Sequence, residues 1–249
     1  MAAAGQVART GSAGWVGAAP KPSLLRYFDA RGAAELTRVL LAVGEVPYVD
    51  TRFSIIQKDG KFETPEFAVA KEDGSLAVNM NRVPVLVLED GTLLGQSKAM
   101  ERYVSRHCNL LGKTEIEGAL IDCVVENVRD IKDRWGKIRS IGGMGPSKEK
   151  DEATTKFLDD NDGEYLQFLR KLEQSLPASR SPGFAVGSAL SYADFAIWNL
   201  CKDTFLDEVP KSASLACLAK CPGLLQIVAS AESCAALGKY LQARKVTKF

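Results

Sequence analysis

The sequence has little of what a metal site requires. It contains a single histidine, His107, and its six cysteines fall within helical patterns rather than in a spaced framework of ligands. Cys217 and Cys221 are four residues apart and could share a helix face, but His107 is far from both along the chain. We therefore expect free thiols in a reducing compartment, and no metal site.

Long apolar runs and an excess of charge of one sign are missing as well. No stretch of about 18 apolar residues occurs, so we expect no membrane span. The 249 residues include 32 Lys and Arg against 31 Asp and Glu, mixed along the chain, which gives no electrostatic reason to expect nucleic acid. With 46% hydrophobic residues the chain can bury one large core or two smaller ones. The expected partner is a small molecule or another protein.

The first 20 residues lack acidic side chains and any apolar periodicity. They are rich in Ala and Gly, and Arg9 is their only charged side chain, so we expect residues 1–20 to be disordered. One arginine is too few for an organelle-targeting peptide, and the apolar centre of a secretory signal is absent. The expected location is cytoplasmic.

Ordered structure is expected to begin with a βαβ unit. Residues 23–28 read as a strand, and residues 33–43 as a helix with an apolar stripe that stops at Gly44. Residues 47–53 read as the second strand, and the crossover between the two strands should be right-handed. A loop of about 29 residues is then expected before Pro84, which is long for a compact domain.

The stretch 82–97 predicts a β-hairpin followed by a helix. Residues 85–88 are strand formers, Asp90-Gly91 is a tight-turn signal, and residues 92–94 can return beside the first strand. Ser97 can cap the helix that follows, in which apolar residues share one face.

Both ends of this unit could bind a small peptide. Pro84 has no amide hydrogen, and a cis Val83-Pro84 bond would turn the amide and carbonyl of Val83 outward to pair with an extended peptide. Gln96 and Ser97 place side-chain donors and the free amides of a helix start where a carboxylate is attracted. A small peptide with a free carboxylate would satisfy both ends.

The second half of the sequence is helical. Apolar residues recur every three or four positions over 116–138 and predict one long amphipathic helix, followed by a glycine-rich and charged break over 141–150. A second long helix is expected over 158–176. Ser191 and Asp194 have the spacing of a capping box, for which an Asp194→Ala change should cost about 1 kcal/mol.

Three of these motifs together carry a family resemblance. Val83-Pro84 before a strand and Gln96-Ser97 at a helix start resemble the glutathione-binding half of the cytosolic glutathione transferases. Residues 25–28 followed by Arg31-Gly32 are similar to the opening of the alpha, mu, pi and sigma classes, closest to sigma and alpha. The capping box resembles the one that opens helix six in that superfamily. The resemblance covers residues 22–249.

The resemblance implies an architecture of α/β plus all-α class. Its first domain, over 21–108, would be thioredoxin-like with βαβ-ββα order, and its second, over 109–249, an all-helical bundle. Members of the family pair as homodimers, so a homodimer is expected here.

The resemblance also implies a glutathione site. Tyr27 would donate its hydroxyl hydrogen bond to the glutathione sulfur, which favours the thiolate, the nucleophilic form. Val83 beside Pro84 would pair with the cysteinyl backbone, and Gln96 and Ser97 would hold the γ-glutamyl carboxylate. For Tyr27 the alternative is a strand-end ring that only packs.

Three charged positions follow from the resemblance more loosely. Lys71 would bind the glycine carboxylate of glutathione, with a solvated surface lysine as the alternative. Asp130 would reach across the dimer to the glutathione amino group, with a charge on a solvated helix face as the alternative. Arg31 lies near the thiolate, but Ala33 replaces the second arginine of the usual Arg-Gly-Arg, which predicts weaker thiolate stabilisation.

The function implied is that of a tyrosine-type glutathione transferase, with glutathione as co-substrate. A small hydrophobic electrophile would bind in an apolar pocket between the domains, for which Trp135, Ile138 and Met144 are the suggested lining. The alternatives are a non-catalytic carrier or structural protein on the same fold, and a sigma-type glutathione-dependent isomerase or peroxidase. Ordinary apolar residues do not identify the electrophile.

Overall fold

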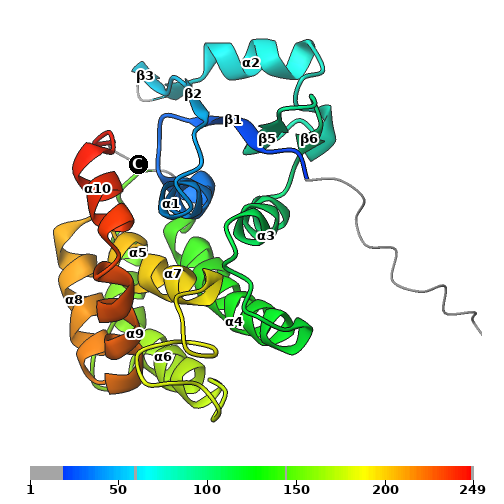
Figure 1. The fold of residues 1–249 in the computed structure, drawn as a ribbon. Coiled ribbons are helices and arrows are strands. Elements are labelled where there is room, and N and C mark those ends of the chain that lie inside the picture. The colour runs from blue at the N-terminus through cyan, green and yellow to red at the C-terminus, as the bar shows by residue number, and fades with distance from the viewer. Residues whose placement is uncertain (1–18, 59–60, 144, 248–249) are drawn as a thin grey trace, which may run out of the picture.

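The computed structural model describes residues 19–58, 61–143 and 145–247, and residues 1–18 of the predicted tail lie outside them (Figure 1). The first part of the chain forms a small mixed sheet in the order β2-β1-β5-β6. Its strands are β1 (Pro22–Phe28), β2 (Val49–Phe53), β5 (Val85–Leu88) and β6 (Leu93–Leu94). β1 is parallel to β2, as the βαβ prediction requires, and antiparallel to β5. β5 and β6 are antiparallel, as the hairpin prediction requires.

Two helices pack on one face of this sheet. The crossover between β1 and β2 contains η1 (Gly32–Ala34) and α1 (Glu35–Val43), and α3 (Ser97–His107) follows the hairpin. Leu25 of β1 and Leu86 of β5 are fully buried together with Leu40 of α1 and Met100 of α3. The apolar side chains of the strands and the apolar stripes of both helices thus form one core.

The predicted loop between β2 and Pro84 is wrong, because that segment contains four short elements. They are β3 (Ile56–Lys58), β4 (Lys61–Glu63), α2 (Pro65–Glu72) and η2 (Ala77–Asn79). In α2 only Ala70 is buried, so there is no apolar stripe for a periodicity argument to detect. Phe53, Ala70, Leu76 and Val85 form a second, smaller core.

The second part of the chain is helical. The long helix α4 (Glu115–Arg139) is confirmed, and the break after it ends at Ser147, whose hydroxyl accepts the Lys150 amide at 3.1 Å. The single helix predicted over 158–176 is wrong: α5 (Lys148–Phe157) ends before it and α6 (Glu164–Gln174) begins within it. At Gly163 a Cβ would collide with the Asp159 backbone, so the chain turns sharply between the two helices.

The centre of the helical part is α7 (Tyr192–Trp198), in which every residue is buried. It continues into the π-helical turn η3 (Asn199–Asp203), followed by α8 (Glu208–Ala219), α9 (Pro222–Glu232) and α10 (Ala235–Ala243). The capping box at Ser191 and Asp194 is present. Both α7 and α10 contact α1, so the two parts of the chain share a wide interface (Figure 1). The fold therefore has the predicted α/β plus all-α class.

The described residues contain neither a single membrane-spanning helix nor a cluster of metal ligands. No single helix within them is long and apolar enough to cross a membrane, although α8 and α9, bent by 116° at their break, pass the length and composition test as a pair. The six cysteines are free, and the described part of the chain brings together no group of three His, Cys, Asp or Glu that could hold a metal.

Candidate functional site

A cavity of about 610 Å³ lies between the two parts of the chain. The end of β1, η1 and the start of α3 form one side, and α4 and η3 form the other. Tyr27, Arg31 and Ser97 line it, as does Trp135 from the suggested electrophile pocket. Ile138 is buried in the core and does not line the cavity, and Met144 lies outside the described residues.

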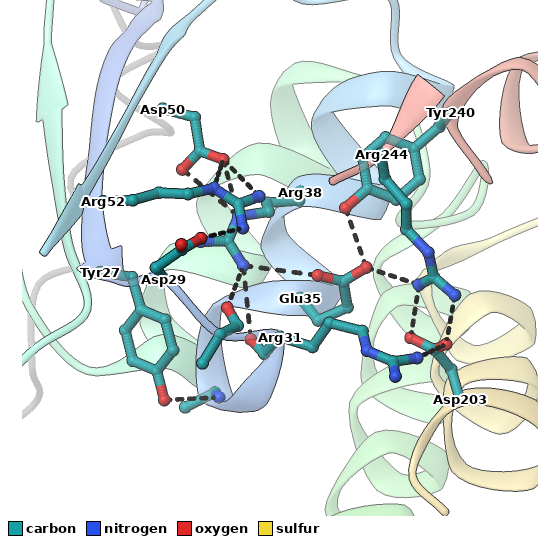
Figure 2. A network of polar contacts seen from close by, with 12 residues as sticks. Tyr27, Asp29, Arg31, Glu35, Arg38, Asp50, Arg52, Asp203, Tyr240 and Arg244 are labelled. Carbon is teal, nitrogen blue, oxygen red and sulfur yellow. Dashed lines mark hydrogen bonds and ion pairs between the residues drawn. The ribbon is translucent and has the colours of Figure 1, made fainter. Parts of the chain in front are cut away.

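The hydroxyl of Tyr27 is held by the loop that follows β1. Its oxygen accepts a hydrogen bond from the backbone amide of Ala33 at 3.0 Å (Figure 2). The hydrogen of the phenol is therefore left to donate to a group in the cavity. Ala33 lacks the arginine side chain of the usual motif, but its backbone still fixes the tyrosine.

Gly32 is required for this arrangement. Its φ is +41°, in the left-handed region that favours glycine, and a Cβ there would collide with the Tyr27 hydroxyl. The Arg-Gly dipeptide after β1 thus has a local steric reason that does not depend on any ligand.

Arg38 supports the same loop from behind and was missed by the sequence reasoning. It is fully buried in α1, donates to the Ala30 carbonyl at 2.8 Å and to Asp50 at 3.1 Å, and lies 5.7 Å from the centre of the Tyr27 ring. The sequence carries one signal for this role, since Arg38 stands among the apolar residues of a helix that is predicted to be buried. An arginine is buried only when partners surround it.

Arg31 lines the cavity but is already paired. Its guanidinium contacts Asp203 of η3 at 3.0 Å, across the boundary between the two parts of the chain. Asp203 also binds Arg244, which in turn contacts Glu35 of α1 at 2.8 Å (Figure 2). Burial by itself would lower the pKa of Arg244, but the hydrogen bonds and charges of Asp203 and Glu35 raise it. Arg31 therefore belongs to an interdomain charge network.

Asn79 joins the two ends of the predicted peptide-binding unit. Its side-chain amide donates to the Pro84 carbonyl at 2.9 Å, and its oxygen accepts the Gln96 amide at 3.2 Å. Asn79 is 4% exposed, and a Cβ on Gly95 would collide with it. Sequence reasoning missed Asn79 because the segment read as a loop and no pattern marked it.

Around Asn79 the backbone has the features expected of the unit. The Val83-Pro84 bond is cis, and among the described residues neither the amide nor the carbonyl of Val83 has a hydrogen-bond partner. Gln96 is exposed with φ of 63°, and Ser97 begins α3 at the wall of the cavity. Val83, Pro84 and Gln96 lie beside the cavity rather than in its wall.

The two loosely assigned charges lie further away. Lys71 is exposed on α2, with its ammonium 5.0 Å from the centre of the Phe67 ring. Asp130 projects from α4 with 70% of its side chain exposed and does not line the cavity. The fold thus brings Tyr27, Arg31 and Ser97 together and leaves Lys71 and Asp130 outside.

Comparisons with known proteins agree on one family. The profile of "Glutathione S-transferase, C-terminal domain" matches residues 139–244. Glutathione S-transferase 4 of Caenorhabditis elegans is 32% identical over 192 residues, which cover 74% of this chain and 82% of the relative. Glutathione S-transferase of Plasmodium falciparum is 30% identical over 182 residues, covering 72% and 79%. Hematopoietic prostaglandin D synthase of Gallus gallus is 28% identical over 225 residues, covering 90% and 96%.

Solved structures give the same result. The pi-class glutathione S-transferase of Onchocerca volvulus has a TM-score of 0.67 and 28% identity, covering 89% of this chain and 92% of that one. The glutathione S-transferase of Ascaris lumbricoides has a TM-score of 0.71 and 20% identity, covering 92% and 100%, which shows the fold alone. A thioredoxin-like first domain, a helical second domain and these relatives establish that the chain belongs to the glutathione S-transferases, enzymes that use glutathione as co-substrate.

Proposed function

We propose that Tyr27 holds the glutathione thiolate in a tyrosine-type transferase. The observation that carries this assignment is the Ala33 amide at 3.0 Å from the Tyr27 oxygen, which leaves the phenolic hydrogen facing the cavity. A thiol with a pKa near 8.5 is only slightly ionised at neutral pH. A donor aimed at the sulfur lowers that pKa and supplies the nucleophile.

The rest of the tripeptide would bind along the unit joined by Asn79. The free amide and carbonyl of Val83, next to Pro84, pair with the cysteinyl backbone, as an added strand pairs with a sheet edge. Gln96 and Ser97 hold the γ-glutamyl carboxylate at the start of α3, where unpaired amides favour an anion.

Lys71 is assigned to the glycine carboxylate. Phe28 lines the cavity, Phe67 contacts Phe28 at 4.9 Å between ring centres, and Lys71 lies over Phe67. The ammonium is thus one ring removed from the cavity wall, within reach of the end of an extended tripeptide.

The electrophile would occupy the cavity against α4. The sulfur attacks its electron-poor carbon. With chlorodinitrobenzene as the probe, the C–S bond forms, the C–Cl bond breaks, chloride leaves with the bonding electrons, and the thiol proton passes to solvent. The family relationship favours this enzyme over the carrier or structural alternative.

Replacing Tyr27 with Phe tests the assignment. It removes one hydrogen-bond donor, and we expect kcat/KM for chlorodinitrobenzene to fall by about a hundredfold, as loss of one such donor does. Steady-state rates are compared with those of Tyr103→Phe, whose hydroxyl bonds the Pro20 carbonyl outside the cavity. Equal rates for wild type and Tyr27→Phe would remove Tyr27 from the mechanism. No turnover by either, with glutathione still bound in calorimetry, would favour a carrier.

We also propose that the protein is a homodimer in which Asp130 binds the amino group of glutathione in the partner subunit. Asp130 is supported in this role by its exposure on α4 and its absence from the cavity of its own chain. A Necator americanus relative, 24% identical with a TM-score of 0.69, is described as monomeric, so the oligomeric state needs its own test.

Light scattering should give twice the chain mass, and Asp130→Asn should raise the KM for glutathione about tenfold, the expected loss of one charge-assisted contact. Glu152→Gln, which removes an exposed acid from α5 outside the cavity, is the control. A monomer that retains full glutathione affinity would contradict the proposal.

A cytoplasmic location is proposed on the state of the cysteines. All six are free, and Cys201, Cys217 and Cys221 are buried thiols, as is usual in a reducing compartment. Cell fractionation followed by immunoblotting tests the location.

A further inference from the structure

One wall of the cavity is a single face of α4. Lys132, Trp135, Gly136 and Arg139 all line the cavity, and their spacing of three and four residues places them in a row along the helix. A Cβ on Gly136 would meet no atom within 4 Å, so the middle of the row is open. An apolar stretch is therefore flanked by two cations two helical turns apart, roughly 10 Å along the axis.

Three other cations of the cavity, all outside the two ends of this row, have carboxylate partners. These pairs are Arg31 with Asp203 at 3.0 Å, Lys98 with Glu101 at 2.8 Å, and Arg129 with Glu126 at 2.7 Å. The two buried acids of the lining, Glu35 and Asp203, are in turn bound by Arg244. The third acid of the lining, Asp133 on α4, has 68% of its side chain exposed to water and lies 4.0 Å from Arg129. Little negative charge is therefore left to face a further cation.

Lys132, at the inner end of the row, has no carboxylate partner among the described residues. It is half-buried, its ammonium donates to the amide oxygen of Asn199 at 2.5 Å, and no carboxylate of the described residues lies within 4.0 Å of it. An ammonium removed from water without a counter-ion is costly, and a bound anion would offset that cost.

The electrostatics agree with the geometry. Burial, and then the neighbouring Lys98, lower the pKa of Lys132 to about 8. The acids that act in the opposite direction come from three other elements: Glu101 on α3, Glu35 on α1 and Asp203 in η3. All three are bound to other cations, so they do not restore the ordinary value.

We propose that the electrophilic substrate is an amphipathic organic acid whose carboxylate binds Lys132 and whose apolar body lies along Trp135 and Gly136. This inference rests on the proposed function and names the substrate class of the same cavity. Lys132 is then a specificity-determining residue, and Arg139 marks the outer end of the row.

A matched substrate pair tests the proposal. The acid is 4-chloro-3,5-dinitrobenzoate, which has its carboxylate para to chlorine. Its rates are compared with those of its methyl ester, in wild type and in Lys132→Gln. The electronic difference between acid and ester is the same for both enzymes, so the change in their ratio isolates the effect of Lys132. We expect Lys132→Gln to lower kcat/KM for the acid about tenfold or more, as loss of a charge-assisted contact does, and to leave the ester within about twofold.

The controls distinguish a failure of the Lys132 proposal from a failure of the proposed function. Lys137→Gln removes a charge from the exposed side of α4 outside the cavity and should leave both substrates unchanged. An equal effect of Lys132→Gln on acid and ester, or a raised KM for glutathione instead, would overturn the proposal while conjugation itself persists. No turnover of acid, ester or chlorodinitrobenzene by wild type would be a failure of the proposed function.

Two further measurements support the test. A pH profile of the wild type does not depend on whether a variant folds, and inhibition by an unreactive acid does not depend on the rate of conjugation. In wild type the preference for the acid should decline as the pH rises past about 8, where Lys132 loses its proton, and Lys132→Arg should retain it. Phenylbutyrate, which does not react, should compete with the electrophile better than phenylbutanol does. Equal inhibition by both, or a preference unaffected by pH, would count against a carboxylate at Lys132.

Discussion

At the scale of single residues, Tyr27 depends on a neighbour that contributes no side chain. Gly32→Ala would place a methyl group against the phenol and force an unfavourable φ. If Tyr27 has the proposed role, kcat/KM for chlorodinitrobenzene should fall by about ten- to a hundredfold, because displacements of a catalytic group by about 1 Å have effects of that size.

Gly91→Ala is the matched control for Gly32→Ala. Gly91 also has a positive φ, of 83°, but a Cβ there meets nothing within 4 Å. The Gly91→Ala variant should lose some stability and keep the kcat/KM of the wild type. Comparable losses of activity in both variants, with equal melting temperatures, would show that backbone strain rather than contact with Tyr27 is responsible.

The sequence pointed to candidate residues that stand in a motif and missed residues that depend on buried contacts. Tyr27 and Ser97 stand in recognisable strings, and the structure places both at the cavity. Asn79, Arg38 and Lys132 depend on segments that are far apart in the sequence, such as Asn199 for Lys132. No local pattern in the sequence shows these partners, because folding alone brings them together.

At the scale of elements, α7 is anchored more strongly than its capping box alone predicts. The Asp194 carboxylate accepts the Ser191 amide at 2.8 Å and also the Ala185 amide at 2.8 Å, and Asp194 is fully buried. Asp194→Ala leaves both amides without a partner. We therefore expect a loss of about 3 kcal/mol in the free energy of unfolding, above the 1 kcal/mol typical of a cap.

Urea denaturation measures this loss, and Ser147→Ala provides the comparison. Ser147 caps α5 at the surface with a single bond to the Lys150 amide, so its loss should cost about 1 kcal/mol. If the two variants lost the same stability, the additional bond to Ala185 would contribute nothing.

Elements were predictable where an apolar stripe or a turn signal was long enough. The helix α4 and the hairpin before α3 have such patterns, and the structure has both. The helix α5 buries only Phe157, and α2 buries only Ala70, so neither carries a stripe. Such short, exposed helices form because tertiary neighbours and their caps favour them, which local periodicity does not report.

At the scale of the whole molecule, the end of the chain fastens the two domains together. Arg244 follows α10 and binds both Glu35 of the first domain and Asp203 of the second, and Tyr240 donates to Glu35 at 2.8 Å. Arg244→Met would leave two buried carboxylates short of a partner. We expect it to lower the free energy of unfolding by about 3 kcal/mol.

Lys239→Met, an exposed change on the same helix, is the control for Arg244→Met and should have little effect. Thermal denaturation followed by circular dichroism reports both. A melting temperature for Arg244→Met equal to that of the control would show that Arg31 alone compensates Asp203 and that the chain end is dispensable.

The Asn79 side chain holds together the two segments that are proposed to bind glutathione. The side-chain amide of Asn79 joins Pro84, the residue before β5, to Gln96, the residue before α3. Its nitrogen donates to the first and its oxygen accepts from the second, so both are used within the protein. In the proposed site, the two segments that would bind the tripeptide are therefore held in alignment by the protein itself. Binding of glutathione there would then cost mainly the conformational entropy of the peptide, and little of the protein's.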